Sequence, residues 1–432
     1  MAKITRKKLF GDVVVIGGGF AGIGAAIAAG RKGLTVYLVE ASRTIGGVMS
    51  SCLGMPFGGG YPLDKNIGGI FHDFVERLYV MNPPAAEKRE CSLHEFGPEV
   101  LYDYDTAVHT LFTMLEEAKV HVLLSTIAVK PVVDKYKIES LFLCDKSGEF
   151  SIDAKIFIDC SGDGDIAKKA GVPYTIGDEN GNMMGVTLTF LMENASWDTI
   201  FPEKYDPYFR QFTKKGIEEG KIHEDLYKLY LMKGFHKDTV FFNSVVIKGV
   251  DATCQGELTR ATHEARKRCH DLKNFVKETI PGFENAIMVN TGVQAGVRET
   301  RKFEGMHYLT GEELAKAMKF DDGIVACDNP VDDVMRRNNS MTHDFIVEKG
   351  EYYTIPFRSL VPKKFQNLMF AGRLISADPT AFASLRGMPQ CMQMGHAIGM
   401  AASMAIRQNI KVQDIDSTQI VEGLRDEGVH MI

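Results

Sequence analysis

The sequence predicts an α/β protein, in which a parallel sheet carries an antiparallel β-meander and the chain is interrupted by an inserted α+β domain. The first observation is a βαβ unit, formed by "DVVVIG" (12–17), an Ala- and Gly-rich helix (20–32) and "TVYLVE" (35–40). The second is a series of strand-like runs joined by short turns, at 126–135, 138–145 and 151–160. The third is the return of an apolar strand near the end of the chain, at 367–371.

The first segment of the chain, residues 1–171, holds the βαβ unit and the meander. A Gly-rich loop at 46–69 follows the second strand, and hydrophobic periodicity predicts helices over 67–80 and 103–120. A second strand–glycine–helix junction, "SGDGDIAKKAG" (161–171), closes this segment.

Residues 172–355 differ in their pattern of expected strands and helices from the first segment. They are predicted to form the inserted domain, which we expect to bind substrate or to act as a cap. Its expected strands lie at 185–192, 239–247 and 286–295. Its expected helices lie at 206–232 and 255–279. Residues 356–432 return to the first fold and end with a helix over 388–406.

The composition limits the class of protein. Hydrophobic residues make up 45% of the 432 and charged residues 25%, which is typical of a globular protein. The net charge of −6 argues against nucleic acid or an anionic membrane as the main partner. The start, "MAKITRKKLFGD", lacks the apolar core of a signal peptide, and no run of 18 apolar residues occurs, so we expect a cytoplasmic protein with no transmembrane segment. Eight cysteines without a CxxC pair predict reduced thiols and no metal site.

The loop after the first strand has the GxGxxG spacing of a dinucleotide-binding site, with its glycines at Gly17, Gly19 and Gly22. The first glycine lets the strand turn sharply, the second lets backbone amides approach a pyrophosphate, and the third lets helix and strand pack closely. The helix N-terminus also contributes Phe20 and Ala21. Glu40, at the end of the second strand, places a carboxylate where an adenosine ribose donates hydrogen bonds.

The residues after the second strand favour FAD over NAD. "EASRTIGGVMSS" continues as a loop of small residues that suits an extended flavin dinucleotide, and the GxGxxG spacing occurs once, so no separate NAD(P) domain is expected. The cofactor-binding candidates in this loop are Ala41, Arg43, Gly46, Gly47 and Ser50. We therefore predict that 1–171 and 356–432 together form a Rossmann-like FAD-binding domain.

Four stretches carry a resemblance to a known family: "DVVVIGGGFAGIGAAIAAGRKGLTVYLVE", "AKIFIDCSGDGDIAKKAGVPY", "TGVQAGVRETRKFEG" and "YYTIPFRSLVPKKFQNLMFAGRLISADPTAFASLRGMPQCMQMGHAIGMAAS". Together they resemble the FAD-dependent oxidoreductase family. These are two-dinucleotide-binding-domain flavoproteins, distantly related to fumarate reductase flavoprotein subunits and geranylgeranyl reductases. The similarity covers most of residues 11–406 in the family's order.

The resemblance implies further cofactor contacts, which are Ser161, Gly162 and Asp163 near the adenine, and Gly372 and Arg373 near the ribityl chain or the pyrophosphate. The last helix begins near Met388 and Pro389, and its N-terminus would direct free amides at an edge of the flavin. Gly395 and Gly399, spaced i and i+4 on this helix, also predict close packing against another helix.

The inserted domain is expected to roof the flavin, and its Arg298 and Arg301 are candidate cations for a carboxylated substrate. Arg358 and Arg386, from the C-terminal segment, are further candidates. Surface pairing of Arg298 and Arg301 with nearby glutamates is the competing interpretation. Acid or base candidates are His307, His396, His72 and Tyr353. Cys52 is interpreted as a packed thiol, with covalent flavin attachment as its alternative.

The leading functional hypothesis is an oxidoreductase that transfers a hydride between N5 of a non-covalent FAD and a small organic substrate, as a dehydrogenase or a C=C reductase. A flavin-dependent monooxygenase is the first alternative, although Gly372-Arg373 replaces the Gly-Asp pair of aromatic hydroxylases. A non-catalytic flavin-binding structural or assembly protein is the second. The sequence does not identify the electron donor or acceptor, and it leaves the oligomeric state open, with a homo-oligomer as one alternative.

Overall fold

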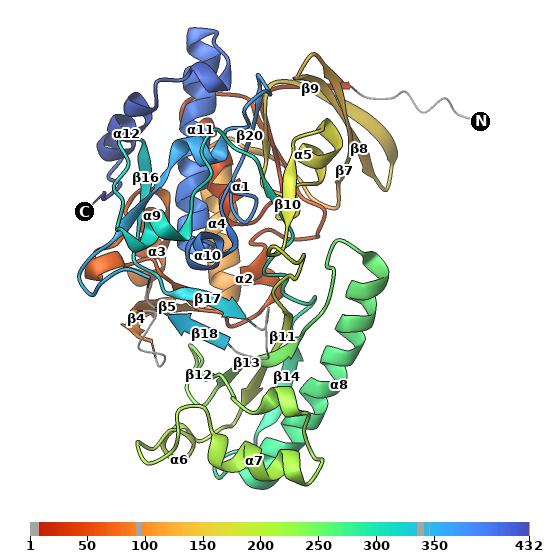
Figure 1. The fold of residues 1–432 in the computed structure, drawn as a ribbon, viewed down its shortest axis with the longest axis vertical. Helices are drawn as coiled ribbons and strands as arrows, with labels where there is room; N and C mark the ends of the chain where they lie inside the picture. Colours follow the sequence, from red (N-terminus) through yellow and green to blue (C-terminus); the bar gives the residue numbers. More distant parts are fainter. Residues whose placement is uncertain (1–7, 92–96, 335–340, 345, 432) are drawn as a thin grey trace.

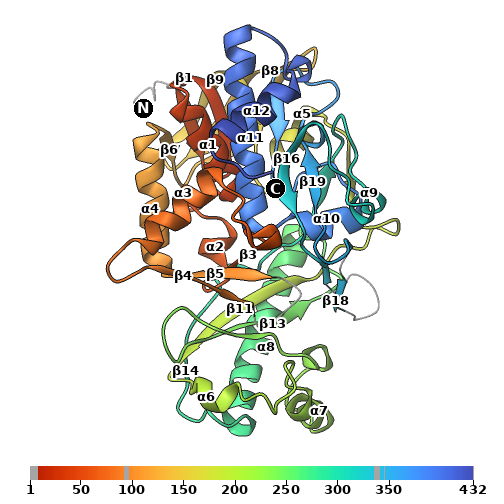
Figure 2. The ribbon, with the colours of Figure 1, turned by 90° about the vertical axis from the view of Figure 1, so that its left-hand side faces the viewer.

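The computed structural model describes residues 8–91, 97–334, 341–344 and 346–431, which form two parts. Figure 1 shows a main part, in which helices and sheets lie in layers, above a smaller part that holds the long helix α8. The view turned by 90° separates the same two parts, with β11 running between them (Figure 2).

The main sheet has the mixed architecture that the sequence predicts. In the described chain its order is β6-β2-β1-β9-β8-β7, with β20 paired to β9. β1 pairs in parallel with β2 and β9, whereas β9–β8 and β8–β7 are antiparallel, which is the predicted meander. The strands are β1 (Lys8–Ile16), β2 (Val36–Val39), β6 (His121–Leu123), β7 (Ile127–Asp134), β8 (Lys137–Asp145), β9 (Gly148–Asp159) and β20 (Leu368–Phe370).

Helices cover both sides of this sheet (Figures 1 and 2). The amphipathic segments expected near 67–80 and 103–120 form α3 and α4, and α4 begins where the Asp103 side chain accepts a hydrogen bond from the amide of Thr106. The helices of the main part are α1 (Phe20–Arg31), α2 (Val48–Ser51), α3 (Gly69–Tyr79), α4 (Tyr104–Glu117), α5 (Asp165–Ala170), α9 (Gly311–Ala315), α10 (Pro379–Leu385), α11 (Met388–Gln408) and α12 (Ser417–Asp426).

Helices α1 and α11 lie in backbone contact at the centre of the main part. A Cβ atom added to Gly395 would lie 1.9 Å from the carbonyl oxygen of Ala21, and one added to Gly399 would lie 2.3 Å from that of Ala25. Only glycine allows this approach, so the predicted role of these two residues in helix packing is confirmed. The contact fixes the end of the chain against the first βαβ unit.

The smaller part, here called the cap, has its own hydrophobic core between Val186 and Val297. Its sheet has the order β12-β13-β11-β14, and α8 packs against β11 and β13. The elements of the cap are β11 (Val186–Glu193), α6 (Trp197–Ile200), α7 (Arg210–Glu218), β12 (Leu231–Lys233), β13 (Val240–Ile247), α8 (Gln255–Thr279) and β14 (Ile287–Thr291).

The cap is shorter than the inserted domain expected over 172–355. Leu309, Leu314 and Tyr353 are buried in the core of the main part, and the backbone of Leu309 exchanges hydrogen bonds with Ser376 and Asp378. The chain therefore re-enters the main part soon after β14. The sequence does not reveal this return because the strands that make it are short.

The single helix expected over 206–232 is wrong. α7 ends near Gly220, whose φ of +68° disfavours other residues, and the chain continues through a short 3-10 turn, Glu224–Leu226, into strand β12. Polar residues at helical spacing follow this glycine, which explains the error.

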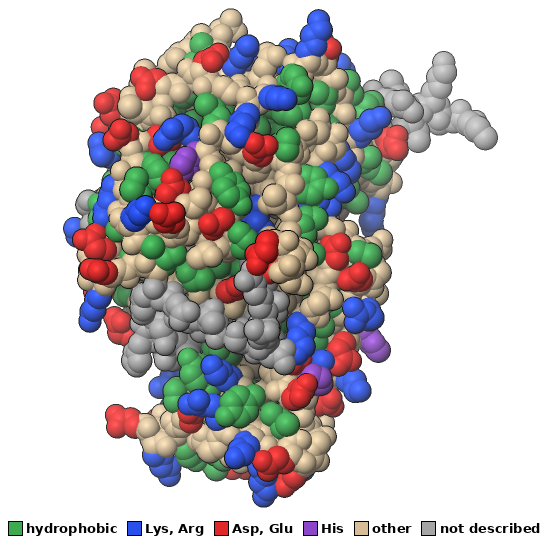
Figure 3. Space-filling view, viewed as in Figure 1, with side chains coloured by type: hydrophobic (Ala, Val, Ile, Leu, Met, Phe, Trp, Pro, Cys, Tyr) green, Lys and Arg blue, Asp and Glu red, His purple; other side chains and the backbone are tan. Residues whose placement is uncertain are grey.

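Short elements complete the described chain. They are β3 (Phe57–Gly58), β4 (Ala86–Glu90), β5 (Pro98–Tyr102), β10 (Tyr174–Ile176), β15 (Arg301–Phe303), β16 (Gly323–Cys327), β17 (Val331–Val334), β18 (Met341–Asp344), β19 (Tyr353–Pro356), and the 3-10 turns Pro62–Asp64, Phe357–Leu360 and Val412–Asp414. Among the described helices, none has both the length and the apolar character that a membrane crossing requires. On the described surface in Figure 3, acidic and basic side chains alternate over the main part and the cap.

Candidate functional site

The glycine loop after β1 has the tight geometry that its spacing predicts. Gly17 has a φ of +98°, and a Cβ atom there would lie 2.3 Å from the carbonyl oxygen of Cys160. A Cβ atom on Gly22 would lie 1.8 Å from the carbonyl oxygen of Gly17. Neither position tolerates a larger residue, because backbone atoms form the obstacle in both cases.

The N-terminus of α1 is built to receive an anion. Gly19 is its N-cap residue, and no side chain caps the helix. The nearest atom to a Cβ on Gly19 would be the Cα of Gly47, at 3.8 Å, so this side of the loop is open. The amides of Phe20 and Ala21 belong to the first turn, which has no partners within the helix. The Phe20 side chain itself packs in the core, with its ring centroid 5.2 Å from that of Phe57. This arrangement fits a dinucleotide pyrophosphate.

The loop after β2 encloses the same space. Glu40 accepts hydrogen bonds from the amides of Gly18, at 2.5 Å, and Ser42, at 2.7 Å, so the backbone holds its carboxylate beside the glycine loop. The amide of Gly46 donates to the carbonyl of Gly18 at 2.7 Å, and the Ser50 hydroxyl donates to the carbonyl of Ile45.

The remaining loop candidates differ in exposure. Gly46 and Gly47 both have positive φ angles, +110° and +57°, which favour glycine. Ala41 and Arg43 lie exposed in the turn before them. The structure thus gathers the predicted adenosine and pyrophosphate residues around one space.

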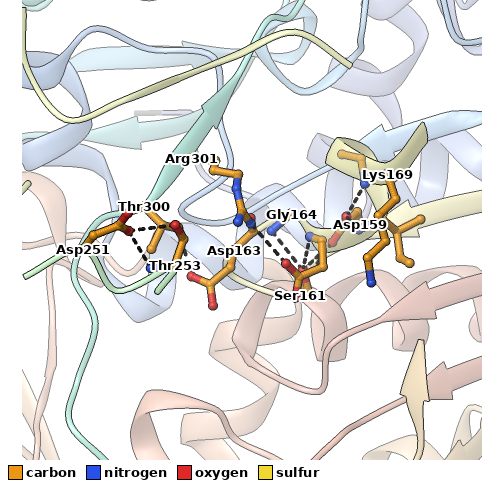
Figure 4. A network of polar contacts seen from close by, with 12 residues as sticks. Asp159, Ser161, Asp163, Gly164, Lys169, Asp251, Thr253, Thr300 and Arg301 are labelled. Carbon is orange, nitrogen blue, oxygen red and sulfur yellow. Dashed lines mark hydrogen bonds and ion pairs between the residues drawn. The ribbon is translucent and has the colours of Figure 1, made fainter. Parts of the chain in front are cut away.

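The second glycine junction forms a polar network with Thr300 and Arg301 (Figure 4). Asp159 is fully buried at the end of β9 and accepts hydrogen bonds from the amide and hydroxyl of Ser161. Burial raises the pKa of Asp159, and these hydrogen bonds oppose that effect. The carboxylate of Asp163 receives the Thr300 hydroxyl and an Arg373 nitrogen, both at 2.8 Å.

Two further cofactor candidates adjoin this network. A Cβ atom on Gly162, where φ is +84°, would lie 2.8 Å from the Arg373 guanidinium. Gly372 also has a positive φ, of +83°. Ser161, Gly162, Asp163, Gly372 and Arg373 therefore adjoin one another, and Arg373 has a carboxylate partner in Asp163.

A cavity of about 250 Å³ lies between the loop after α2, the cap and the start of α11. Its apolar wall includes Val48, Met55, Pro56, Val297, Ala383 and Met388. Its polar wall includes Cys52, Glu99, Thr187, Tyr230, Asn243, Arg298, Asn329, Asp332, Arg373, Ser384 and Arg386. Gly387, the N-cap of α11, also lines it and no side chain caps that helix, so its first amides face this region. Pro389, the next residue after Met388, is buried.

Of the four catalytic candidates, the structure brings Arg298 and Arg386 to the cavity and keeps the other two away from it. Arg301 donates to the carbonyl of Asp163 and pairs with Asp165 at 3.0 Å. His307 lies 3.2 Å from Glu313, outside the cavity wall. The sequence spacing could not predict that Arg298 lines the cavity and Arg301 does not, because the chain between them is irregular before β15 begins at Arg301.

The additional candidates do not line the cavity, and each lies beside another polar side chain. Their partners are Asp322 for Arg358, Glu427 for His396, Ser384 for Tyr353 and Glu76 for His72. Glu427 also pairs with Lys32. Burial would raise the pKa of Glu427, but the hydrogen bonds from His396 and Lys32 lower it to about 2.

Cys52 is a buried thiol in the cavity wall, in agreement with its interpretation as a packed residue. A Cβ atom added to Gly296 of the cap would lie 3.0 Å from its sulfur. Burial raises the pKa of the Cys52 thiol, and the nearby Ser51 hydroxyl and Arg298 charge only partly oppose this. The thiol is therefore neutral near pH 7.

Several polar residues of the cavity were missed by the sequence reasoning. Glu99 is buried and accepts from the Nε of Arg89 at 3.0 Å, while Asp332 pairs with Arg386 at 2.6 Å. Both lie on short strands outside any recognised motif. The acidic pair in "NPVDDV" is the one visible signal, and it does not indicate a cavity.

Comparisons with known proteins agree with this geometry. The family model described as "FAD dependent oxidoreductase" matches residues 12–427. A carotenoid phi-ring synthase of Chlorobaculum tepidum is 38% identical over 80 residues, a stretch that covers 18% of this chain and 11% of that protein.

Solved structures share the fold at low identity. A geranylgeranyl bacteriochlorophyll reductase-like protein of Thermoplasma acidophilum is 14% identical, with 98% of this chain and 84% of that one covered and a TM-score of 0.52. The flavin-dependent brominase Bmp2 is 14% identical, with 96% and 83% covered and a TM-score of 0.51. The p-nitrophenol 4-monooxygenase PnpA of Pseudomonas putida is 11% identical, with 98% and 84% covered and a TM-score of 0.51.

The family model spans nearly the whole chain, and the uncapped helix N-terminus, the open glycine loops and the adjoining cavity fit a flavin dinucleotide. The chain belongs to the FAD-dependent oxidoreductase family, and FAD is its cofactor.

Proposed function

We propose that this enzyme transfers a hydride between a non-covalently held FAD and a small organic molecule bound in the cavity beneath the cap. The observation that carries the proposal is the position of the cavity, which adjoins both the loop after α2 and the N-terminus of α11. Bound FAD supplies the hydride acceptor or donor at its N5 atom. The reaction is either a dehydrogenation or the reduction of an activated C=C bond.

The chain's own residues contribute positioning and electrostatics. The uncapped N-terminus of α11, a helix of 21 residues, presents the positive end of its dipole to the cavity and stabilises negative charge there. Val48, Met55 and Pro56 provide an apolar wall that excludes water. The neutral Cys52 thiol supports non-covalent binding, because attachment through sulfur begins with a thiolate.

A flavin-dependent monooxygenase is the second candidate, favoured by the fold shared with a brominase and a p-nitrophenol monooxygenase. Arg373 in place of the aspartate of aromatic hydroxylases argues against it. An oxygenase should consume NAD(P)H and O2 in the presence of a phenol, and hydride transfer without oxygen distinguishes the first proposal.

An absorption spectrum of the purified protein tests the proposal first. Bands near about 370 and 450 nm that move to the supernatant on acid precipitation indicate non-covalent flavin. Anaerobic bleaching by a hydroxy acid, an amine or a sugar, or reoxidation of dithionite-reduced protein by an enoate, should then follow. Failure to bind FAD would refute the proposal, and colour in the pellet would refute the non-covalent part.

The sequence-based predictions of a cytoplasmic location, a separate electron partner and a homo-oligomer extend this proposal. Cell fractionation, reduction by candidate donors and light scattering would test them in turn.

A further inference from the structure

Most of the charged side chains that line the cavity have an oppositely charged partner, but one does not. In the described lining these are Glu99, Arg298, Asp332, Arg373 and Arg386. Glu99 pairs with an arginine outside the lining at 2.9 Å, and Arg373 pairs with an aspartate outside the lining at 2.8 Å. Asp332 and Arg386 pair with each other at 2.6 Å. One positive charge, that of Arg298, remains.

Arg298 contacts neutral oxygens where its neighbours contact carboxylates. One of its terminal nitrogens donates to the hydroxyl of Thr187 and, at 3.4 Å, to the carbonyl of Gly185. No carboxylate in the described chain lies within ion-pair distance of it. The side chain is only partly buried, and it lines the cavity.

The surroundings of Arg298 increase the effect of its charge. Burial lowers the pKa of its guanidinium; Asp332 raises it, while Arg386 lowers it further. The guanidinium stays protonated near neutral pH because its ordinary pKa is so high. A charge that is partly withdrawn from water and has no counterion is costly, and a ligand anion that supplies one is bound strongly.

We propose that the cavity binds a small monocarboxylate with an apolar body, whose carboxylate pairs with Arg298. This inference rests on the proposed function, in which the reacting molecule occupies the same cavity. A single excess positive charge favours one carboxylate over two. The apolar wall of Val48, Met55, Val297 and Met388 accommodates the rest of the molecule.

The test compares an anion with its neutral isostere on the holoprotein. Benzoate and benzamide are titrated by calorimetry and by the flavin absorption spectrum, with terephthalate as the dianion. The same titrations are made with Arg298→Gln, Arg298→Lys and the control Arg210→Gln, whose ion pair with Asp206 lies at the surface of the cap. FAD content is measured by acid release in every sample.

We expect benzoate to bind about 10- to 100-fold more tightly than benzamide, which is the contribution of a charged hydrogen bond. Terephthalate should bind no better than benzoate. Arg298→Gln should remove the preference for benzoate without loss of FAD, Arg298→Lys should keep part of it, and Arg210→Gln should keep all of it.

Four results would each overturn the inference: no benzoate binding to the holoprotein, equal affinity for benzoate and benzamide, full benzoate affinity in Arg298→Gln, or FAD loss in that variant. The last result would assign Arg298 to the cofactor. A protein that holds FAD but shows no benzoate preference refutes this inference alone. A protein that binds no FAD refutes the proposed function. Benzoate and benzamide are then titrated into this protein by calorimetry, and equal affinities would overturn the inference as well.

Discussion

The substitution Gly395→Ala tests whether the α1–α11 contact holds the FAD loop in place. The added Cβ would lie 1.9 Å from the carbonyl oxygen of Ala21 and 2.9 Å from the amide nitrogen of Ala25. Both obstacles are backbone atoms of α1, which no side-chain rotation can remove. The helices must therefore separate.

The size of the effect follows from the overlap. Ordinary contact begins near 3.4 Å, so the oxygen of Ala21 must move away by about 1.5 Å from its present 1.9 Å. Overpacking of a core costs about 1–3 kcal/mol, and an obstacle of rigid backbone lies at the upper end of that range. The better helix propensity of alanine returns about 1 kcal/mol. We expect a net loss of about 2 kcal/mol or more.

The assay is urea unfolding followed by circular dichroism, together with the affinity for FAD. Gly256→Ala, in α8, is the matched control, because no atom lies within 4 Å of its added Cβ. The control should be neutral or slightly stabilising. Because Ala21 belongs to the anion-binding first turn of α1, Gly395→Ala should also weaken FAD binding. A variant within about 0.5 kcal/mol of the wild type, with unchanged FAD affinity, would refute the reasoning.

Three further predictions concern the glycine loop after β2, the thiol of Cys52 and the carboxylate of Glu427. Gly47→Ala should weaken FAD binding at least about tenfold in a flavin titration, whereas Gly33→Ala, where φ is also positive but the added Cβ meets no atom, should not; equal affinities would contradict this. Iodoacetamide should modify Cys52 at least about tenfold more slowly than the exposed Cys254 near pH 7 by mass spectrometry, and equal rates would contradict the burial that raises the pKa of Cys52. The folded pKa of Glu427 is about 2, below its ordinary 4.5, so the stability it adds is present above about pH 4.5 and lost as pH falls toward 2. The unfolding free energy of the wild type should exceed that of Glu427→Gln by at most about 3 kcal/mol near pH 6, and a gap that persists at pH 2.5 would contradict the assignment.

The fold and the cofactor loops could be predicted because their signals are contiguous. The turn at Gly17 and the packing at Gly22 follow from residues that are neighbours in sequence. The meander and α8 likewise follow from local periodicity. The prediction of the FAD site therefore depended on residues that lie close together in the sequence.

The cavity could be predicted only in part, because its polar residues come from separate segments. Arg298 and Arg301 occupy one short motif, yet the first lines the cavity and the second pairs with Asp165 at the start of α5. That separation arises from pairing of β15 with β10, which local sequence does not encode. Glu99 and Asp332 lie on other short strands, β5 and β17, outside any recognised motif, and the acidic pair in "NPVDDV" does not indicate a cavity.

Helix α11 contacts both the helix that carries the FAD loop and the cavity. A substitution in this helix should therefore affect both, whereas a substitution in the cap should affect the cavity alone. The glycine face of α11 holds α1 and hence the FAD loop, while its first residues, Gly387 and Met388, line the cavity. Gly395→Ala should thus disturb the cofactor and the cavity together. Arg298 comes from the cap and does not contact this helix interface, so its removal should change ligand preference while FAD stays bound. Two variants with these separate outcomes would establish that the main part binds the cofactor and the cap selects the substrate.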